Sequence, residues 1–342
     1  MEVTHEIIHF QEQLSSMENS EIKPLNFEKL KTGRVRNISK LGIHYVLKHY
    51  KYVRFGIKWA QDRQKKAKFP LNLIVEPTNR CELKCVFCAR QIMTRKQGDM
   101  KLSLFKSVID SLLERNCLPY HMLMHFYGES LLNPDLCKMI RYAKDAGVPI
   151  VRYNTHGTFL DNTKCLEILR SGLDILDIVV GPTKEIHNKV RLGSDLDLVE
   201  RNIMRLKSLR KGQRPPLYGE MLAMKGVTSQ EDLQSGFEKW SRIFDLFDVV
   251  PAATIGGQVP DYDPRPRPKD FCREIWTNSV ILWNGDVTVC CVDSNAQLVV
   301  GNVNDDSLVD IWNNRKYENL REIHRRREYF KVPLCEQCMM VR

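Results

Sequence analysis

Short apolar runs alternate along the chain with stretches whose apolar residues recur every three or four positions, beginning at residue 70. The runs cover residues 71–75, 122–126, 149–153, 175–180, 217–222 and 247–250. Helix-period stretches lie between them, at residues 104–113, 136–146, 165–169, 198–209 and 233–243. Regular alternation of this kind predicts a parallel sheet wound by right-handed crossovers. Six strand–helix units predict an α/β fold with a partial (βα)6 barrel, similar to a TIM barrel, over residues 69–255.

A different pattern precedes this barrel. Residues 1–68 lack strand alternation and carry apolar side chains among basic ones, as at Leu41, Val46, Leu47 and Tyr50. We therefore expect an N-terminal helical extension. A basic helix with aromatic residues either packs against the main domain, which is the commoner case, or lies on a membrane surface.

A third pattern follows the barrel, over residues 256–342. Residues 256–268 are rich in Gly, Pro and Asp and predict a linker. Apolar residues at 280–283 and 287–290 flank Asn284-Gly285, which predicts a β-hairpin with a type I′ turn because both residues tolerate a positive φ. Helix-period stretches at 308–313 and 316–327 complete a small C-terminal α+β domain.

Composition limits which cellular compartment and which binding partners are expected. No apolar run approaches the roughly 20 residues needed to span a bilayer, and residues 1–11 lack the features of a signal peptide. We therefore expect a cytoplasmic protein, in which 11 cysteines are metal ligands or catalytic thiols more often than disulfides. The net charge of +10 is compatible with nucleic acid, an anionic membrane or an acidic protein, but solvated helix faces explain it more simply. No nucleic-acid partner is expected.

Three cysteines lie in the loop that follows the first predicted strand. Cys81, Cys85 and Cys88 have the spacing CxxxCxxC and stand at the strand's C-terminal end, where barrel enzymes place their chemistry. Three thiolates can bind three irons of a four-iron cluster and leave the fourth iron open, as a catalytic metal requires. A structural zinc site is the alternative, but zinc needs four ligands and this loop has no histidine to complete them.

The segment 76–90, EPTNRCELKCVFCAR, resembles the signature of the radical S-adenosylmethionine (SAM) superfamily. In that family the open iron binds the amino and carboxylate groups of SAM. Reductive cleavage of SAM then gives a 5′-deoxyadenosyl radical. The resemblance therefore implies a [4Fe-4S] cluster and SAM as cofactors.

Other parts of the barrel are similar to SAM-binding motifs of the same family. Tyr127-Gly128-Glu129-Ser130 resembles its GGE-like motif, which implies that Gly128 and Glu129 hold the methionine ammonium. Asn154 begins a turn similar to the family's TNG turn, with His156 where Asn is usual. Glu220, in the fifth predicted strand, stands where relatives contact the SAM carboxylate or adenine. A buried glutamate is costly without a partner, so one is expected for Glu220.

A second cysteine set lies in the C-terminal part. Cys272, Cys290, Cys335 and Cys338, with a glycine five residues before Cys290, resemble the SPASM or twitch subdomain of radical SAM enzymes. A structural zinc ion fits the spacing alone equally well. The resemblance implies one auxiliary [4Fe-4S] cluster with every iron ligated. Such a cluster has no open position for substrate, so its role is to accept an electron, which favours net oxidation.

The residue beside one of these ligands, Cys291, has two interpretations. Neighbours along a strand point to opposite faces, so Cys290 and Cys291 are not expected to ligate one cluster together. Cys291 is either a buried core thiol or a catalytic hydrogen-atom donor, as in radical SAM epimerases that invert one carbon. The base for an oxidation is not identified by sequence, but His125, Tyr127 and Lys225 lie beside predicted strand ends.

Three functions follow from these patterns. The favoured one is oxidation or epimerisation of a polar, sugar-like small molecule such as an aminoglycoside, nucleoside or other glycoside. The second is maturation of a ribosomal peptide, although residues 1–68 lack the strand alternation of a winged-helix peptide-recognition domain. The third is a basic RNA-binding or membrane-associated scaffold, which leaves the open three-cysteine loop unexplained. An enzyme of this kind needs a low-potential donor, and we expect flavodoxin or ferredoxin.

Overall fold

The computed structural model describes residues 66–212, 214–252, 258–260, 262, 272–336 and 338. The helical extension expected over residues 1–68 lies outside the described residues except for 66–68, and so does most of the expected linker at 256–268. In the part of the chain that the structure describes, no helix is long and apolar enough to cross a membrane.

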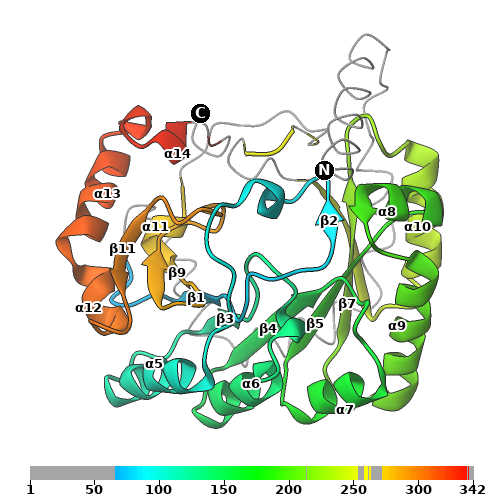
Figure 1. Ribbon diagram of the computed structural model, residues 1–342, viewed down its shortest axis with the longest axis horizontal. Coiled ribbons are helices and arrows are strands. Elements are labelled where there is room, and N and C mark those ends of the chain that lie inside the picture. The colour runs from blue at the N-terminus through cyan, green and yellow to red at the C-terminus, as the bar shows by residue number, and fades with distance from the viewer. Residues whose placement is uncertain are drawn as a thin grey trace.

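Parallel strands form the curved wall of the molecule (Figure 1). They are β1 (Asn72–Val75), β3 (His121–Leu123), β4 (Ile150–Thr155), β5 (Ile175–Val180), β7 (Leu217–Ala223) and β8 (Leu246–Pro251). Each pairs in parallel with the next in this order. The expected α/β class and the partial (βα)6 barrel are confirmed, since each apolar run predicted as a barrel strand contains one of these strands or overlaps it.

Helices cover the outer face of this wall (Figure 1). They are α5 (Leu102–Glu114), α6 (Leu136–Asp145), α7 (Asn162–Arg170), the short α8 (Lys184–Val190), α9 (Leu196–Arg210) and α10 (Gln230–Trp240). Strand β7 shows why the layers form: its alternate residues Leu217, Gly219, Met221 and Ala223 are buried. Because successive side chains point to opposite faces, the partly exposed residues between them, such as Glu220, face the barrel interior.

The C-terminal strands continue the same sheet. Strand β9 (Asn278–Ile281) pairs in parallel with β1, and the antiparallel strands β10 (Asp286–Thr288) and β11 (Val299–Asn302) follow, giving the order β11-β10-β9-β1-β3-β4-β5-β7-β8. Helices α11 (Glu274–Thr277), α12 (Leu308–Asn313), α13 (Arg315–Arg325) and α14 (Pro333–Glu336) lie at this end (Figure 1). The auxiliary cysteines are therefore carried on an extension of the barrel sheet.

The hairpin expected around Asn284-Gly285 is present, but its type I′ turn is wrong. Gly285 has a φ of 93°, whereas Asn284 is not among the residues with positive φ. The Gly285 amide donates to the Leu282 carbonyl at 2.9 Å, and the Leu282 amide donates to Asp286 at 2.8 Å. These bonds close a three-residue loop, in which a regular turn is followed by one left-handed residue. The positive φ favours glycine at position 285, where a Cβ would also lie 2.4 Å from Asn304 Nδ2.

Candidate active site

The cysteine loop is held by a short ribbon that the sequence did not predict. Strand β2 (Lys84–Cys85) pairs antiparallel with β6 (Arg191–Leu192), and the Val86 amide donates to the Val190 carbonyl at 3.0 Å. The Cys88 amide then donates to the Cys85 carbonyl at 3.1 Å, just before the 3-10 helix η2 (Ala89–Ile92). The backbone of the loop is therefore fixed by hydrogen bonds of the protein itself.

The three thiols of this loop are suited to a bound metal cluster. Burial raises the pKa of each, that of Cys85 to about 11. The guanidinium of Arg191 opposes this shift, since its Nη1 lies 4.0 Å from Cys85 Sγ. A thiol that is hard to ionise in an apolar site becomes a thiolate when a cation binds it. These residues fit an iron–sulfur cluster held by Cys81, Cys85 and Cys88.

A buried ion pair ties the loop to the rest of the molecule. The Glu76 side chain, directly after β1, has no exposed surface and accepts from Arg95 at 2.6 and 3.0 Å. Arg95 Nε also donates to the Ser294 carbonyl at 2.7 Å, and the Trp283 amide donates to Glu76 at 3.3 Å. Arg95 thus connects β1, the cysteine loop and the C-terminal part. Sequence analysis missed this residue because no local pattern marks it.

The turn after β3 packs tightly on the same loop. Gly128 has a φ of 138°, and a Cβ there would lie 2.4 Å from the Thr78 carbonyl oxygen. The next residue, Glu129, donates from its amide to the Arg80 carbonyl at 2.8 Å. A glycine is therefore required at position 128, where the backbone of the predicted SAM-binding turn meets the backbone of the cysteine loop.

The carboxylate of Glu129 is buried and accepts hydrogen bonds from several donors. One oxygen accepts from the Leu131 amide at 3.0 Å and from Tyr153 Oη at 2.9 Å. The other accepts from Thr155 Oγ1 at 2.9 Å and from the His156 amide at 3.2 Å. Only 1% of Glu129 is exposed. These partners come from the turn after β3 and from β4 and its end, so they fix the carboxylate at the cavity wall.

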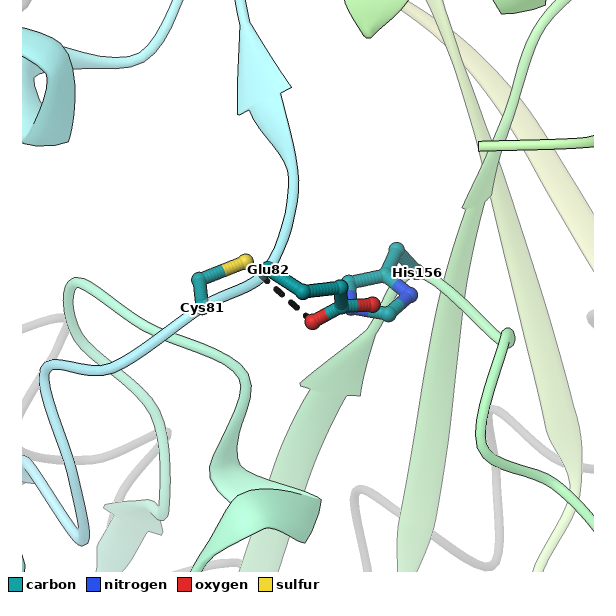
Figure 2. A group of neighbouring side chains, drawn as sticks. All are labelled: Cys81, Glu82 and His156. Carbon is teal, nitrogen blue, oxygen red and sulfur yellow. Dashed lines mark hydrogen bonds and ion pairs between the residues drawn. The ribbon is translucent and has the colours of Figure 1, made fainter. Parts of the chain in front are cut away.

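His156, the residue that departs from the family's turn, reaches the first cysteine (Figure 2). Its Nε2 lies 3.1 Å from Glu82 Oε1 and 3.2 Å from Glu129 Oε2. Burial disfavours the charged imidazolium, but Glu129, Cys81 and Glu82 together outweigh burial and raise the pKa of His156 to about 10. Cys81 belongs to the three-cysteine loop, so the group Cys81, Glu82 and His156 is part of that site.

The predicted SAM-binding residues face one cavity of about 300 Å³. Its lining includes the three loop cysteines, His125, Tyr127, Arg191 and the predicted residues Gly128, Glu129, Asn154 and Glu220. Lys225, the third residue considered as a base, is not part of this lining. The volume lies at the lower end of the range typical for small-molecule sites. The expected partner of Glu220 is Arg152, whose Nη2 lies 3.4 Å from Glu220 Oε1.

The four C-terminal cysteines come together at the far end of the sheet. Burial and then the neighbouring Cys290 raise the pKa of Cys272, and the same causes with Cys338 raise that of Cys335 to about 12. Four thiolates can hold either a zinc ion or an iron–sulfur cluster, and the resemblance to the SPASM domain favours the cluster.

Cys290 and Cys291 contact different surroundings. Cys290 packs against the main hydrophobic core, whereas Cys291 packs with Ile74, Val280 and Leu282 in a separate cluster. The Glu274 carboxylate hydrogen-bonds the Cys291 thiol and accepts from Asn278 Nδ2 at 2.7 Å. A hydrogen bond with Cys290, burial and the Glu274 charge raise the pKa of Cys291 well above its ordinary value. Cys291 thus has the Glu274 carboxyl as a partner.

Two family models match the chain. The model of the radical SAM superfamily matches residues 75–234, and that of the SPASM iron–sulfur cluster-binding domain matches residues 272–339. The chain is 23% identical over 268 residues to the S-adenosyl-L-methionine-dependent 2-deoxy-scyllo-inosamine dehydrogenase of Niallia circulans, covering 77% of this chain and 90% of the relative.

Solved structures share the fold. The crystal structure of BtrN in complex with AdoMet and 2-DOIA has a TM-score of 0.55 at 18% identity, and the match covers 80% of this chain and 94% of that one. The structure of SuiB of Streptococcus suis bound to the precursor peptide SuiA has a TM-score of 0.62 at 13% identity, covering 80% and 72%. At these identities the likeness shows the fold alone.

Proposed function

Since the chain is a radical SAM enzyme with a C-terminal SPASM domain, we propose that it oxidises a polar, sugar-like small molecule and uses the auxiliary cluster as electron acceptor. When bound, SAM and its [4Fe-4S] cluster supply a 5′-deoxyadenosyl radical that removes a hydrogen atom from a substrate carbon. The carbon is then oxidised when the substrate radical gives up one electron and one proton. A hydroxyl-bearing carbon becomes a ketone in this way.

The position of Tyr127 is the observation that carries this proposal. Tyr127 lines the cavity, and the pKa of its phenol is raised first by burial and then by the neighbouring Cys88, Cys291 and Cys290. One cavity-lining side chain is therefore within electrostatic range of both cysteine sets. A substrate in the cavity would lie close to the proposed electron acceptor, as an oxidation requires.

His125 is the favoured base for removal of the proton. It lines the cavity, and its Nδ1 is buried with no hydrogen-bond partner. Burial lowers the pKa of His125 to about 4, so the imidazole is neutral at neutral pH. A neutral imidazole can accept the hydroxyl proton while the electron leaves, and the two losses together give a carbonyl group.

The comparisons support a small molecule as substrate. The relative of Niallia circulans, by its name, is a dehydrogenase of 2-deoxy-scyllo-inosamine, and it matches most of this chain. A peptide is the alternative substrate, because SuiB, whose fold is similar, was solved with a precursor peptide. We also propose that an acidic flavodoxin or ferredoxin delivers the first electron, since a net charge of +10 favours its docking.

A product analysis tests the oxidation. Anaerobically reconstituted enzyme is incubated with SAM, dithionite and a panel of polyhydroxylated substrates or precursor peptides, and products are identified by mass spectrometry. Oxidation predicts a product lighter by two hydrogen atoms and one 5′-deoxyadenosine per product. His125→Phe should keep SAM cleavage and lose product, whereas Cys117→Ser, outside the cavity lining, should behave as wild type. A product of unchanged mass would refute the oxidation.

Epimerisation is the second candidate, favoured by the surroundings of Cys291. Its thiol hydrogen-bonds Cys290 and packs with Ile74 and Val280 beside the Glu274 carboxyl, which can serve as a proton source, although Cys291 is not among the residues that line the cavity. A thiol that donates a hydrogen atom to a substrate radical becomes a thiyl radical, which one electron from the external donor and one proton restore to the thiol. The hydrogen that such a thiol carries exchanges with solvent. In D2O, epimerisation therefore predicts a product heavier by one deuterium, and Cys291→Ser should abolish that product while SAM cleavage continues. Ketone formation by Cys291→Ser at the wild-type rate would exclude this role.

A further inference from the structure

A basic surface lies at the end of the molecule that carries the auxiliary cysteines (Figure 1). It comprises α13 and the 3-10 helix η4 (Tyr329–Lys331), and residues 315–331 are called the basic edge here. These 17 residues include seven Lys and Arg and three Glu, a net charge of +4 out of +10 for the whole chain. Arg326 and Lys331 are 63% and 50% exposed, and Arg327 is exposed as well. Positive charge is therefore concentrated at this edge.

An aromatic side chain is exposed beside these cations. Phe330 is 66% exposed, the largest exposed fraction among the large apolar side chains that the structure describes. The chain reverses just before it, because Arg327 has a φ of 58° and the amides of Arg327 and Glu328 donate to carbonyls of α13 at 3.1 and 3.0 Å. An apolar side chain within a charged rim is the arrangement found at protein–protein interfaces.

The basic edge also contacts the predicted ligands of the auxiliary cluster. His324 Nε2 lies 3.6 Å from Cys335 Sγ, and the rings of His324 and Tyr329 meet edge to face with their centroids 5.0 Å apart. Burial raises the pKa of Tyr329, and the neighbouring Cys272 and Cys335 raise it further. The exposed Phe330 is therefore the next residue after a side chain that lies close to two of the four cysteines.

The proposed oxidation leaves one electron on the auxiliary cluster in each turnover, and this electron must be removed before the next one. An oxidised carrier protein that accepts one electron restores the cluster, and no atom is transferred. Electron transfer slows steeply with distance, so the carrier must dock close to the cluster's ligands. Flavodoxins and ferredoxins are acidic, so a basic surface at that place attracts them and orients them.

We propose that the basic edge is the docking surface of an acidic one-electron carrier, which takes up the electron that the auxiliary cluster received from the substrate. Phe330 is the apolar anchor of this surface, and the cations around it, Arg326, Arg327 and Lys331, attract the carrier. This inference rests on the proposed function, in which the auxiliary cluster accepts an electron, and it places the partner on the chain. Binding of nucleic acid would require the same charge but no closeness to the cysteines.

Electron transfer from the auxiliary cluster alone tests the docking surface. The full chain with Cys81→Ala, Cys85→Ala and Cys88→Ala is reconstituted, so that only the auxiliary site is loaded. The cluster is reduced photochemically, and the protein is mixed in a stopped-flow instrument with oxidised flavodoxin or oxidised ferredoxin. The absorbance of the carrier then reports its reduction. Because no substrate or SAM is present, the result does not depend on whether the enzyme oxidises its substrate, which the product analysis measures separately.

Two pairs of variants are compared in this background. Arg326→Glu with Lys331→Glu reverses two cations of the basic edge, each paired with a glutamate. Lys138→Glu with Lys184→Glu changes the net charge equally on α6 and α8, at lysines that are 69% and 57% exposed and are each paired with an aspartate. Phe330→Ala has Met204→Ala on α9, 49% exposed, as its control. Iron content and circular dichroism are measured for every variant, and Arg326→Gln with Lys331→Gln replaces the reversal if it loses iron.

Reversal at the basic edge should lower the second-order rate of carrier reduction at least about tenfold, whereas reversal on α6 and α8 should lower it less than about twofold. Raising the salt from about 0.05 to about 0.5 M should slow the unreversed protein toward the reversed one. Phe330→Ala should weaken binding of the oxidised carrier at least about fivefold, with no change in Met204→Ala. Equal slowing by both reversals, a rate independent of salt, or no reduction of either carrier would overturn the inference. RNA binding that is lost on reversal at the basic edge, without reduction of either carrier, would assign this surface to nucleic acid instead.

Discussion

Replacing Arg95 by methionine should destabilise the protein strongly, because the change leaves the Glu76 carboxylate buried without its cation. Glu76 has no exposed side-chain surface, and Arg95 is 11% exposed and donates to it at 2.6 and 3.0 Å. Breaking a buried pair by removing one partner costs about 3–5 kcal/mol. The Arg95→Met variant should therefore lose about that much free energy of unfolding.

Urea unfolding, followed by tryptophan fluorescence and circular dichroism on anaerobically reconstituted protein, measures this loss. The matched control is Arg115→Met, which breaks a bidentate pair with Asp310 whose side chains are 46% and 56% exposed. That exposed pair should contribute only about 0–1 kcal/mol. Glu76→Gln combined with Arg95→Met should recover part of the loss, because the buried charge is gone. A loss in Arg95→Met no larger than in Arg115→Met, or no recovery in the double variant, would refute the reasoning.

Three further changes give separate tests. Glu129→Gln alters the buried carboxylate at the cavity wall, so it should weaken SAM binding at least about tenfold in a calorimetric titration while the iron content stays unchanged. An unchanged SAM affinity would contradict the predicted role of Glu129. Burial raises the pKa of Asp177 from 3.8 to about 7, so the folded protein keeps a proton that the unfolded chain releases. Relative to Asp177→Asn, wild-type stability should fall by up to about 1.4 kcal/mol per pH unit between pH 4 and 7 and then level off, and a constant difference would contradict this. His324→Phe should lower the reduction potential of the auxiliary cluster in an EPR titration, because it removes an imidazole Nε2 that lies 3.6 Å from Cys335 Sγ; an unchanged potential would exclude that contact as a cause.

The sequence predicts the position of a strand correctly where the apolar run and the strand end at the same residue. The run at 175–180 matches β5 residue for residue. The run at 122–126 does not match β3, which ends at Leu123, because Phe126 lines the cavity after the strand has ended. Apolar composition alone does not distinguish a residue packed in the core from one that lines a binding cavity. The two-residue strands β2 and β6 are too short to produce any period.

The two cysteine sets could be predicted because the spacing of their ligands is local in the sequence. The residues that hold the first cysteine loop in place could not be predicted. Glu76 and Arg95 are 19 residues apart on opposite sides of the loop, and nothing in either neighbourhood marks the pair. Where β1 pairs with β9, Asn72 Nδ2 donates to Asn278 Oδ1 at 2.8 Å, although the two residues are 206 positions apart in the sequence. The ion-pair cluster of Arg152, Asp177 and Glu220 is also non-local, because these residues come from three strands. Only the parallel pairing of those strands places their carboxylates around one guanidinium.

Iron counting after anaerobic reconstitution tests the central claim most directly. It compares the wild type with the variant Cys81→Ala, Cys85→Ala, Cys88→Ala, with 5′-deoxyadenosine formation assayed under dithionite. One SAM-binding cluster and one auxiliary cluster predict about eight irons in the wild type and about four in the variant, with 5′-deoxyadenosine formation lost in the variant. Zinc instead of iron at the auxiliary site would contradict the account, and so would continued 5′-deoxyadenosine formation by the variant.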